Sequence, residues 1–235
     1  MLNDIKQWDG KIHIISDERF FALLTDNEYQ VYCALKSISY HNNRGKHHLF
    51  TDQISFRELS KKLELKVGKN KNGDDTVMTR QTLSRIFKSL EEKKIINKGI
   101  IFDDKECYFI ITEKDYKFTR IDNELLKVMT KCLKGQVIKT YVYIKANFEY
   151  NKLNGKNYTL MNRETIAKAI NETNKHTGEI KKKNLDNITA YTTTLYNLGL
   201  LDISLMTIKS INGAYSSCYR IDAVSDKLKQ IPKRK

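Results

Sequence analysis

The sequence predicts a mainly α-helical protein with small antiparallel β hairpins, arranged as two similar domains. Three observations lead to this fold class: capped segments with apolar residues at helical spacing, pairs of short β-like runs, and one order of segments that occurs twice along 235 residues. We expect residues 1–119 to form domain 1 and residues 120–224 to form domain 2, with residues 225–235 as a basic C-terminal tail.

The charge balance indicates a polyanionic partner. The chain has 42 Lys and Arg residues against 28 Asp and Glu residues, a formal net charge of +14, and such a surface attracts nucleic acid over long range. No apolar run approaches the roughly 20 residues that a membrane span needs, and the N-terminus has no secretory signal. We therefore expect a cytoplasmic protein that does not bind membranes.

The residues that usually carry catalysis or bind metals form no recognisable motif. The four cysteines, Cys33, Cys107, Cys132 and Cys218, have no C-x-x-C pairing, so we expect buried thiols and no metal site. The pair His47-His48 is interpreted as part of a plain loop. Because no P-loop, paired-carboxylate or nucleophile signature occurs either, we expect no enzyme and no cofactor.

Domain 1 begins with a capped helix. Thr25 and Glu28 form a capping box, and apolar residues follow it at helical spacing up to Tyr40. A second capping box, Ser55–Glu58, predicts a short second helix. A third helix begins at Thr79, with its apolar face formed by Leu83, Ile86, Phe87 and Leu90.

Two β-like runs follow the third helix of domain 1. They cover residues 95–102 and 107–112 and flank the acidic tip Asp103-Asp104. Three helices followed by a hairpin predict a winged helix-turn-helix. Since the acidic tip has the wrong sign for contact with phosphates, we expect it to face a partner or solvent.

Domain 2 repeats this order. A capped segment from Asp122 to a helix stop at Gly135 predicts an added or connecting helix. The three main helices are expected at residues 137–150, 162–170 and 184–198, and the hairpin turn at Asn212-Gly213. The last strand of each domain carries a similar segment, Cys107–Ile110 and Cys218–Ile221. The sequence therefore predicts two tandem winged helix-turn-helix domains joined by the short segment Thr119–Asp122.

Two segments carry a resemblance to known proteins. Leu24–Tyr32 resembles the first-helix opening of winged-helix regulators and replication proteins, and Ile138–Lys145 is similar. The layout of residues 20–222 resembles plasmid and phage replication initiators of Gram-positive hosts, which use two winged helices to bind repeated sites at an origin. The resemblance implies a sequence-specific double-stranded DNA-binding protein that initiates replication of a mobile element. Such motifs specify a fold better than a function, and no residue matches an ATPase, primase or nicking site.

The third helix of domain 1 has the polar outer face that a helix in the major groove needs. Arg85 suits guanine and Gln81 suits adenine, whereas Arg80 and Lys88 suit backbone phosphates. The DNA-binding candidates of domain 1 are Thr79, Arg80, Gln81, Thr82, Ser84, Arg85 and Lys88.

In domain 2 the run Lys181–Lys183, which we expect to precede the third helix, is a candidate for phosphate contact. The outer face of that helix supplies the remaining candidates, Asn187, Ala190, Thr193 and Asn197. Several tyrosines occur at helical spacing, which favours core packing over stacking on single strands. Residues 227–235 are expected to form a flexible basic extension.

Two alternatives remain open. A winged-helix transcription regulator has the same sequence features, and a winged-helix protein-interaction module has a similar fold. The expected partner is double-stranded DNA, with host replication proteins or a second copy of the chain as further candidates. A regulator would bind a lone palindrome, whereas an initiator would bind direct repeats.

Overall fold

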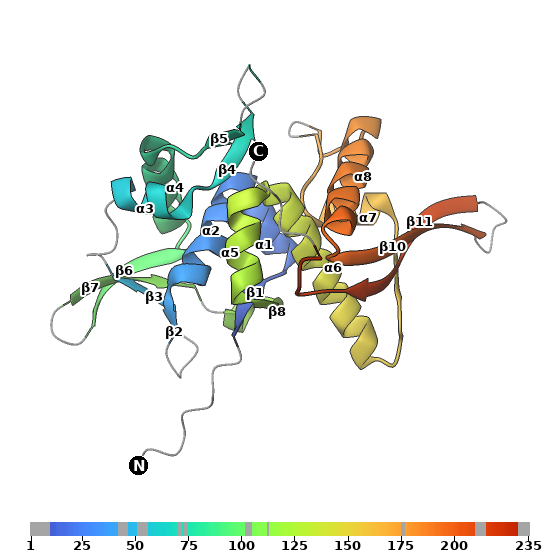
Figure 1. Ribbon diagram of the computed structural model, residues 1–235, viewed down its shortest axis with the longest axis horizontal. Helices are drawn as coiled ribbons and strands as arrows, with labels where there is room; N and C mark the ends of the chain where they lie inside the picture. Colours follow the sequence, from blue (N-terminus) through green and yellow to red (C-terminus); the bar gives the residue numbers. More distant parts are fainter. Residues whose placement is uncertain are drawn as a thin grey trace, which may run out of the picture. The chain divides into compact units, whose positions relative to one another are not determined.

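A computed structural model describes residues 10–41, 47–50, 56–69, 72, 75–101, 105–111, 113–174, 177–209 and 215–229. Helices and small antiparallel sheets make up the structure, in agreement with the predicted fold class (Figure 1). The chain forms two compact units. Unit 1 comprises Met1–Ile15 and Leu24–Gly135, and unit 2 comprises Ser16–Leu23 and Gln136–Lys235.

Unit 1 contains most of the strands. Its elements in chain order are β1 (Lys11–Ile15), α2 (Asp26–Ile38), β2 (Tyr40–His41), β3 (His47–Phe50), α3 (Phe56–Leu63), β4 (Lys66–Lys69), β5 (Asp75–Val77), α4 (Arg80–Glu92), β6 (Ile96–Ile101), β7 (Lys105–Ile110), a 3-10 helix (Glu113–Asp115), β8 (Phe118–Asp122) and α5 (Asn123–Cys132). Four strands form one antiparallel sheet in the order β2-β3-β7-β6, and β1 pairs with β8.

Unit 2 is smaller. Its elements are α1 (Glu18–Leu23), α6 (Gly135–Leu153, beginning at the last residue of unit 1), β9 (Thr159–Met161), α7 (Arg163–Ala169), α8 (Lys182–Asn197), β10 (Leu201–Lys209) and β11 (Tyr215–Val224). The three strands form an antiparallel sheet in the order β10-β11-β9.

The two units share one arrangement of strands and helices. In each, a strand, two helices and a hairpin follow in this order, and in unit 1 the additional pair β4-β5 lies between the two helices. The last hairpin strand pairs with that first strand: β7 with β3, and β11 with β9. Tyr108 pairs with Leu49, and Tyr219 pairs with Met161. Both tyrosines are buried, so the repeated segments noted in the sequence occupy equivalent places in the two sheets.

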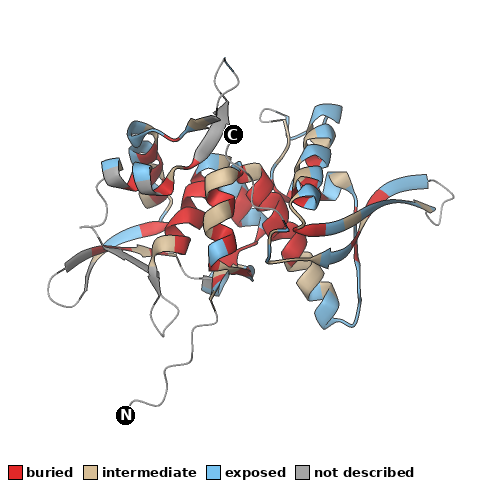
Figure 2. Ribbon diagram, viewed as in Figure 1, coloured by how far each residue is buried: buried red, intermediate tan, exposed pale blue. Residues whose placement is uncertain are grey.

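Local capping signals determine where several helices begin. Thr25 accepts a hydrogen bond from the amide of Glu28, and Glu28 accepts one from the amide of Thr25, so the predicted capping box is confirmed. Asn162 caps α7, and Thr79 caps α4. Buried residues concentrate on α2 in unit 1 and on the first half of α6 in unit 2, as Figure 2 shows. Ser55 lies outside the described residues.

The connection between the units differs from the expected one. Thr119–Asp122 belongs to strand β8 and pairs with β1, and the chain passes between the units after Ile15, Leu23 and Gly135. The α1 side chains Phe20 and Phe21 are fully buried in unit 2. Consequently, cutting the chain in β8 does not separate the units.

Gly135 does not stop a helix, contrary to the sequence-based expectation. The helix capped by Asp122 ends at Cys132, and Gly135 is instead the first residue of α6. A Cβ atom at Gly135 would lie within van der Waals overlap of the backbone carbonyl of Asp26. The glycine is therefore required by the close approach of two backbone segments.

We expect Gly135→Ala to lower the free energy of unfolding by about 3 kcal/mol, because a backbone atom cannot move aside as a flexible side chain can. Urea denaturation followed by circular dichroism measures the change. Gly155→Asn is the control, since its Cβ would meet open space and asparagine tolerates the left-handed backbone at Gly155. Equal stability of Gly135→Ala and the wild type would contradict the proposed close packing.

The C-terminal extension begins later than expected. The Tyr141 hydroxyl lies 2.9 Å from the carbonyl oxygen of Ser225, and Lys145 Nζ donates to Asp226 at 3.1 Å. The Lys229 amide donates to the Leu198 carbonyl at 3.0 Å. Residues 225–229 are thus packed on unit 2, and 230–235 lie outside the described residues. No helix in the described part of the chain is long and apolar enough to cross a membrane.

Candidate nucleic-acid interface

Helix α4 has one buried and one exposed face. Leu83, Ile86, Phe87 and Leu90 point into the core of unit 1, as their spacing predicts. At the beginning of the helix, Thr79 Oγ1 accepts a hydrogen bond from the amide of Thr82 at 3.2 Å. The opposite face, which carries Gln81, Ser84, Arg85 and Lys88, is exposed.

Glu28 attaches α4 to the first helix of unit 1. Its carboxylate accepts hydrogen bonds from Ser89 Oγ at 2.5 Å, Lys93 Nζ at 2.7 Å and the Thr25 amide at 2.7 Å. Burial raises the pKa of this carboxyl, but the hydrogen bonds from Lys93, Ser89 and Thr25 outweigh burial and hold the pKa below its ordinary value. One acidic side chain thus caps α2 and fixes α4.

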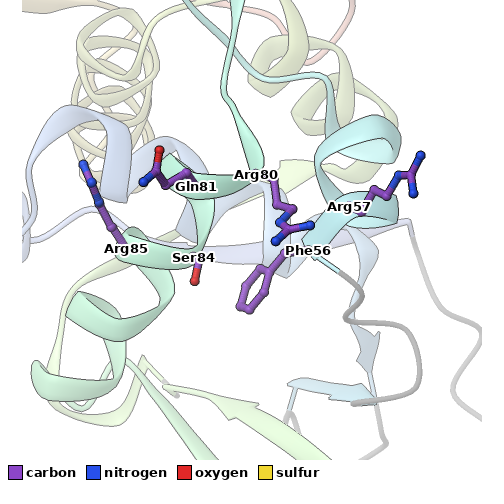
Figure 3. A pocket seen from close by; sticks show the side chains of 6 residues that line it. All are labelled: Phe56, Arg57, Arg80, Gln81, Ser84 and Arg85. Carbon is purple, nitrogen blue, oxygen red and sulfur yellow. The ribbon is translucent and has the colours of Figure 1, made fainter.

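A hollow of about 490 Å³ lies between α3 and α4. Its lining residues, shown in Figure 3, are Phe56, Arg57, Arg80, Gln81, Ser84 and Arg85. Arg80 extends from the beginning of α4 toward Phe56, while Arg57 and Arg85 lie at opposite sides of the hollow (Figure 3). Phe56 also packs edge-to-face on Phe87, with ring centroids 5.1 Å apart. The hollow is therefore built on the core of unit 1.

The arginines of this hollow have no acidic partner in the described part of the chain. Arg57, Arg80 and Arg85 form no ion pair with any carboxylate among the described residues, whereas Arg19 pairs with Asp17 at 3.0 Å. None of the described residues that line the hollow is acidic. Three guanidinium groups line one hollow, and each can present a fork of donors to a phosphate or a guanine.

The structure brings four predicted DNA-binding residues together in this hollow: Arg80, Gln81, Ser84 and Arg85. Thr79 and Thr82 are hydrogen-bonded to each other in the cap of α4, with their hydroxyl oxygens 3.0 Å apart. Lys88 is exposed on α4 but does not line the hollow.

Sequence reasoning missed Arg57 and Phe56. Arg57 lies in the first turn of α3 and joins the other arginines only because α3 and α4 pack together. The sequence held one signal, a basic residue two positions after the expected cap at Ser55, but nothing local to that residue indicates that it lies beside the third helix.

The lysine run of unit 2 lies at the beginning of α8. Lys181 is the residue before the helix, and Lys182 and Lys183 form its first turn, so the run does not wholly precede the helix as expected. All three side chains are exposed. Positive charge is unfavourable at the positive end of a helix dipole, and a bound anion would remove this repulsion.

Asn187 does not belong to the outer face of α8, contrary to the sequence-based expectation. Its side-chain amide donates to Glu172 Oε1 at 2.9 Å, and Asn184 and Tyr191 also bond to that carboxylate. The helical period placed Asn187 outside, but the loop that follows α7 covers this edge of α8. Ala190, Thr193 and Asn197 are exposed.

Asp186 is a further exposed residue of α8, which was not among the predicted candidates. Its carboxylate would repel phosphates, but a carboxylate can accept a hydrogen bond from the amino group of cytosine. The acidic charge therefore favours base contact over backbone contact near this position.

The remaining predictions concern the histidine pair, the cysteines, a metal site and the two hairpin turns. His47 and His48 belong to strand β3, so their interpretation as a loop was wrong. Cys33, Cys107 and Cys218 are buried free thiols, and Cys132 is half-buried. Among the described residues, no three His, Cys, Asp or Glu side chains lie close enough together to hold a metal ion. The tip residues Asp103 and Asp104 and the turn at Asn212-Gly213 lie outside the described residues.

No protein-family model, no curated protein and no solved structure matches this chain.

Proposed function

We propose that this chain is a sequence-specific double-stranded DNA-binding protein, and that each unit is a winged helix-turn-helix. In this proposal α4 and α8 enter the major groove, and the hairpins β6-β7 and β10-β11 are the wings. The observation that carries it is the hollow between α3 and α4, where three arginines without carboxylate partners among the described residues lie beside Gln81 and Ser84. A net charge of +14 supports the same partner.

Arg85 and Gln81 have the chemistry for reading bases. A guanidinium donates to both acceptors of guanine, and a glutamine side chain pairs with both groups of adenine in the major groove. Arg57 and Arg80, at the α3 side of the hollow, are assigned to phosphates, because the helix that crosses the backbone precedes the recognition helix.

In unit 2 the exposed lysines at the beginning of α8 are assigned to phosphates. Ala190 and Thr193 on the outer face are assigned to thymine methyl groups, and Asn197 to polar contacts. Since Ala190, Thr193 and Asn197 are uncharged, the three lysines are expected to carry most of the salt dependence of unit 2.

For the biological process we propose initiation of replication of a mobile element, which the resemblance to plasmid and phage initiators supports. Selection of duplexes from a random library with the purified protein tests this proposal. Direct repeats among the selected duplexes support initiation, and a lone palindrome supports transcription regulation. If no duplex is enriched, the interaction-module alternative replaces DNA binding.

We expect replacement of Lys181, Lys182 and Lys183 by alanine to weaken the binding of selected and scrambled duplexes alike, because phosphate contacts carry little sequence information. The slope of log affinity against log salt should decrease by about 0.9 for each phosphate that the variant no longer binds. The charge-matched control replaces Lys152, Lys156 and Lys227, which are exposed elsewhere on unit 2. Equal slopes for the two triple variants would show that the run at α8 binds no phosphate.

A further inference from the structure

A second hollow, of about 330 Å³, lies in unit 2 between α8 and the hairpin β10-β11. In Figure 1 the hairpin extends from the base of α8 and continues well beyond it. The helix side of the hollow is formed by Thr189, Thr193 and Tyr196, which recur at helical spacing. The hollow thus follows one edge of the proposed recognition helix.

Arg163 supplies a guanidinium group to the lining of this hollow. Arg163, the first residue of α7, donates from Nη1 to Thr189 Oγ1 at 3.3 Å. Among the described residues no carboxylate forms an ion pair with Arg163, whereas Arg220 on the neighbouring strand pairs with Asp222 at 2.8 Å. Arg163 is therefore held in place by a neutral hydroxyl, and its positive charge can bind an anion.

The floor of the hollow is made of linked hydroxyl groups. The Tyr219 hydroxyl lies 3.3 Å from Thr192 Oγ1 and 3.4 Å from Thr189 Oγ1. Thr192 and Tyr219 are buried, so these hydroxyls are fixed by the core of unit 2. Within the part of the chain that the structure describes, no acidic residue lines the hollow. Thr189 and Thr192 donate their hydroxyl hydrogens to the backbone carbonyls of Leu185 and Ile188. The donors that face an anion are therefore the Arg163 guanidinium and the exposed lining hydroxyls of Thr193, Ser204 and Ser217.

The hairpin side of the hollow is partly apolar. Leu205 leaves 68% of its surface exposed, and Ile203 lies next to it on the same face of β10. An exposed leucine beside an anion-binding group suits a ligand with both charged and apolar parts. A deoxyribose phosphodiester has this character, because its phosphate is charged and the sugar carbons are apolar.

We propose that this hollow binds one phosphodiester of the DNA strand that passes between α8 and the hairpin, with the phosphate on Arg163 and the Thr193 hydroxyl and the deoxyribose against Leu205. This inference rests on the proposed function of the chain. If α8 lies in the major groove and the hairpin follows the adjacent minor groove, the sugar-phosphate backbone that separates these grooves crosses the space between the two elements.

The test uses Arg163→Gln in the full chain, with Lys168→Gln as the matched control. Lys168 is exposed on the same helix and does not line the hollow, so both variants remove one positive charge from α7. The probe is a duplex selected by the wild-type protein, prepared as a set in which a single phosphate at a time is replaced by an uncharged methylphosphonate. Thermal unfolding of each variant verifies the fold.

For the wild type and Lys168→Gln we expect weaker binding when one particular phosphate is neutralised. For Arg163→Gln the same neutralisation should not weaken binding further. The slope of log affinity against log salt should be smaller for this variant by about 0.9. If Arg163→Gln responds to every methylphosphonate as the wild type does, the hollow does not bind a phosphodiester, although Arg85→Ala still weakens binding and the proposed function stands. If the wild type binds no duplex, both proposals fail.

Discussion

Replacing Arg80 and Arg85 together by alanine is expected to weaken binding of the selected duplex by more than the about 1–3 kcal/mol that one bidentate contact to a base contributes. Arg85 supplies that base contact and Arg80 adds a phosphate contact, and neither has a carboxylate partner among the described residues. Arg85→Ala alone should weaken the selected duplex more than a scrambled one, whereas Arg80→Ala should weaken both equally. Equilibrium titrations on the two duplexes give all of these values.

The control for this pair is Lys114→Ala with Lys134→Ala. Both lysines are exposed in unit 1 outside the hollow, so the variant removes the same charge. It should retain nearly full affinity and full preference for the selected duplex. If the control weakens binding as much as the arginine pair does, the contribution of the hollow is only its net charge.

Glu28→Gln is expected to lower the free energy of unfolding by about 3 kcal/mol, because it removes the charge of a buried carboxylate that three donors face, including the partly exposed Lys93. Since the Glu28 contacts join α2 to α4, amide hydrogen exchange in α4 should also become faster. Urea denaturation and exchange measurements provide the two values.

The stability contributed by Glu28 depends on pH in a definite direction. The pKa of this carboxyl is lower in the folded protein than its ordinary value of 4.5. Its contribution is therefore fully present above about pH 4.5 and disappears as the pH falls through the lower folded pKa. The stability difference between wild type and Glu28→Gln should shrink over that range.

Glu124→Gln is the matched control for Glu28→Gln. Glu124 also lies in the first turn of a helix and pairs with a lysine, but 79% of its side chain is exposed. An exposed ion pair contributes at most about 1 kcal/mol, so little change is expected. If both variants are equally stable at pH 7, the buried network does not hold α4.

The elements with local signals were predictable from the sequence. The caps at Thr25, Thr79 and Asn162 depend on residues within one turn, and the buried face of α4 follows from its period. The strands β1 and β8 pair residues far apart in the sequence. Their pairing depends on long-range packing, which no local pattern specifies.

The exposed face of α4 was predictable from the sequence, but residues that depend on contacts between separate segments were not. The period of α4 places Gln81, Ser84 and Arg85 outside, and the structure agrees. Arg57 was missed because its position beside α4 depends on the packing of two helices. Asn187 was assigned incorrectly because Glu172, from a loop that no period describes, binds its side chain.

Hydroxyl-radical footprinting of the selected duplex at saturating protein concentration tests the central claim, that the exposed faces of both α4 and α8 contact one duplex. The wild type should protect two groups of nucleotides. Arg80→Ala with Arg85→Ala should abolish protection in one group, and the triple lysine variant at α8 should abolish protection in the other. A single protected group that both variants leave unchanged would contradict the assignment of α4 and α8 as the DNA-binding helices.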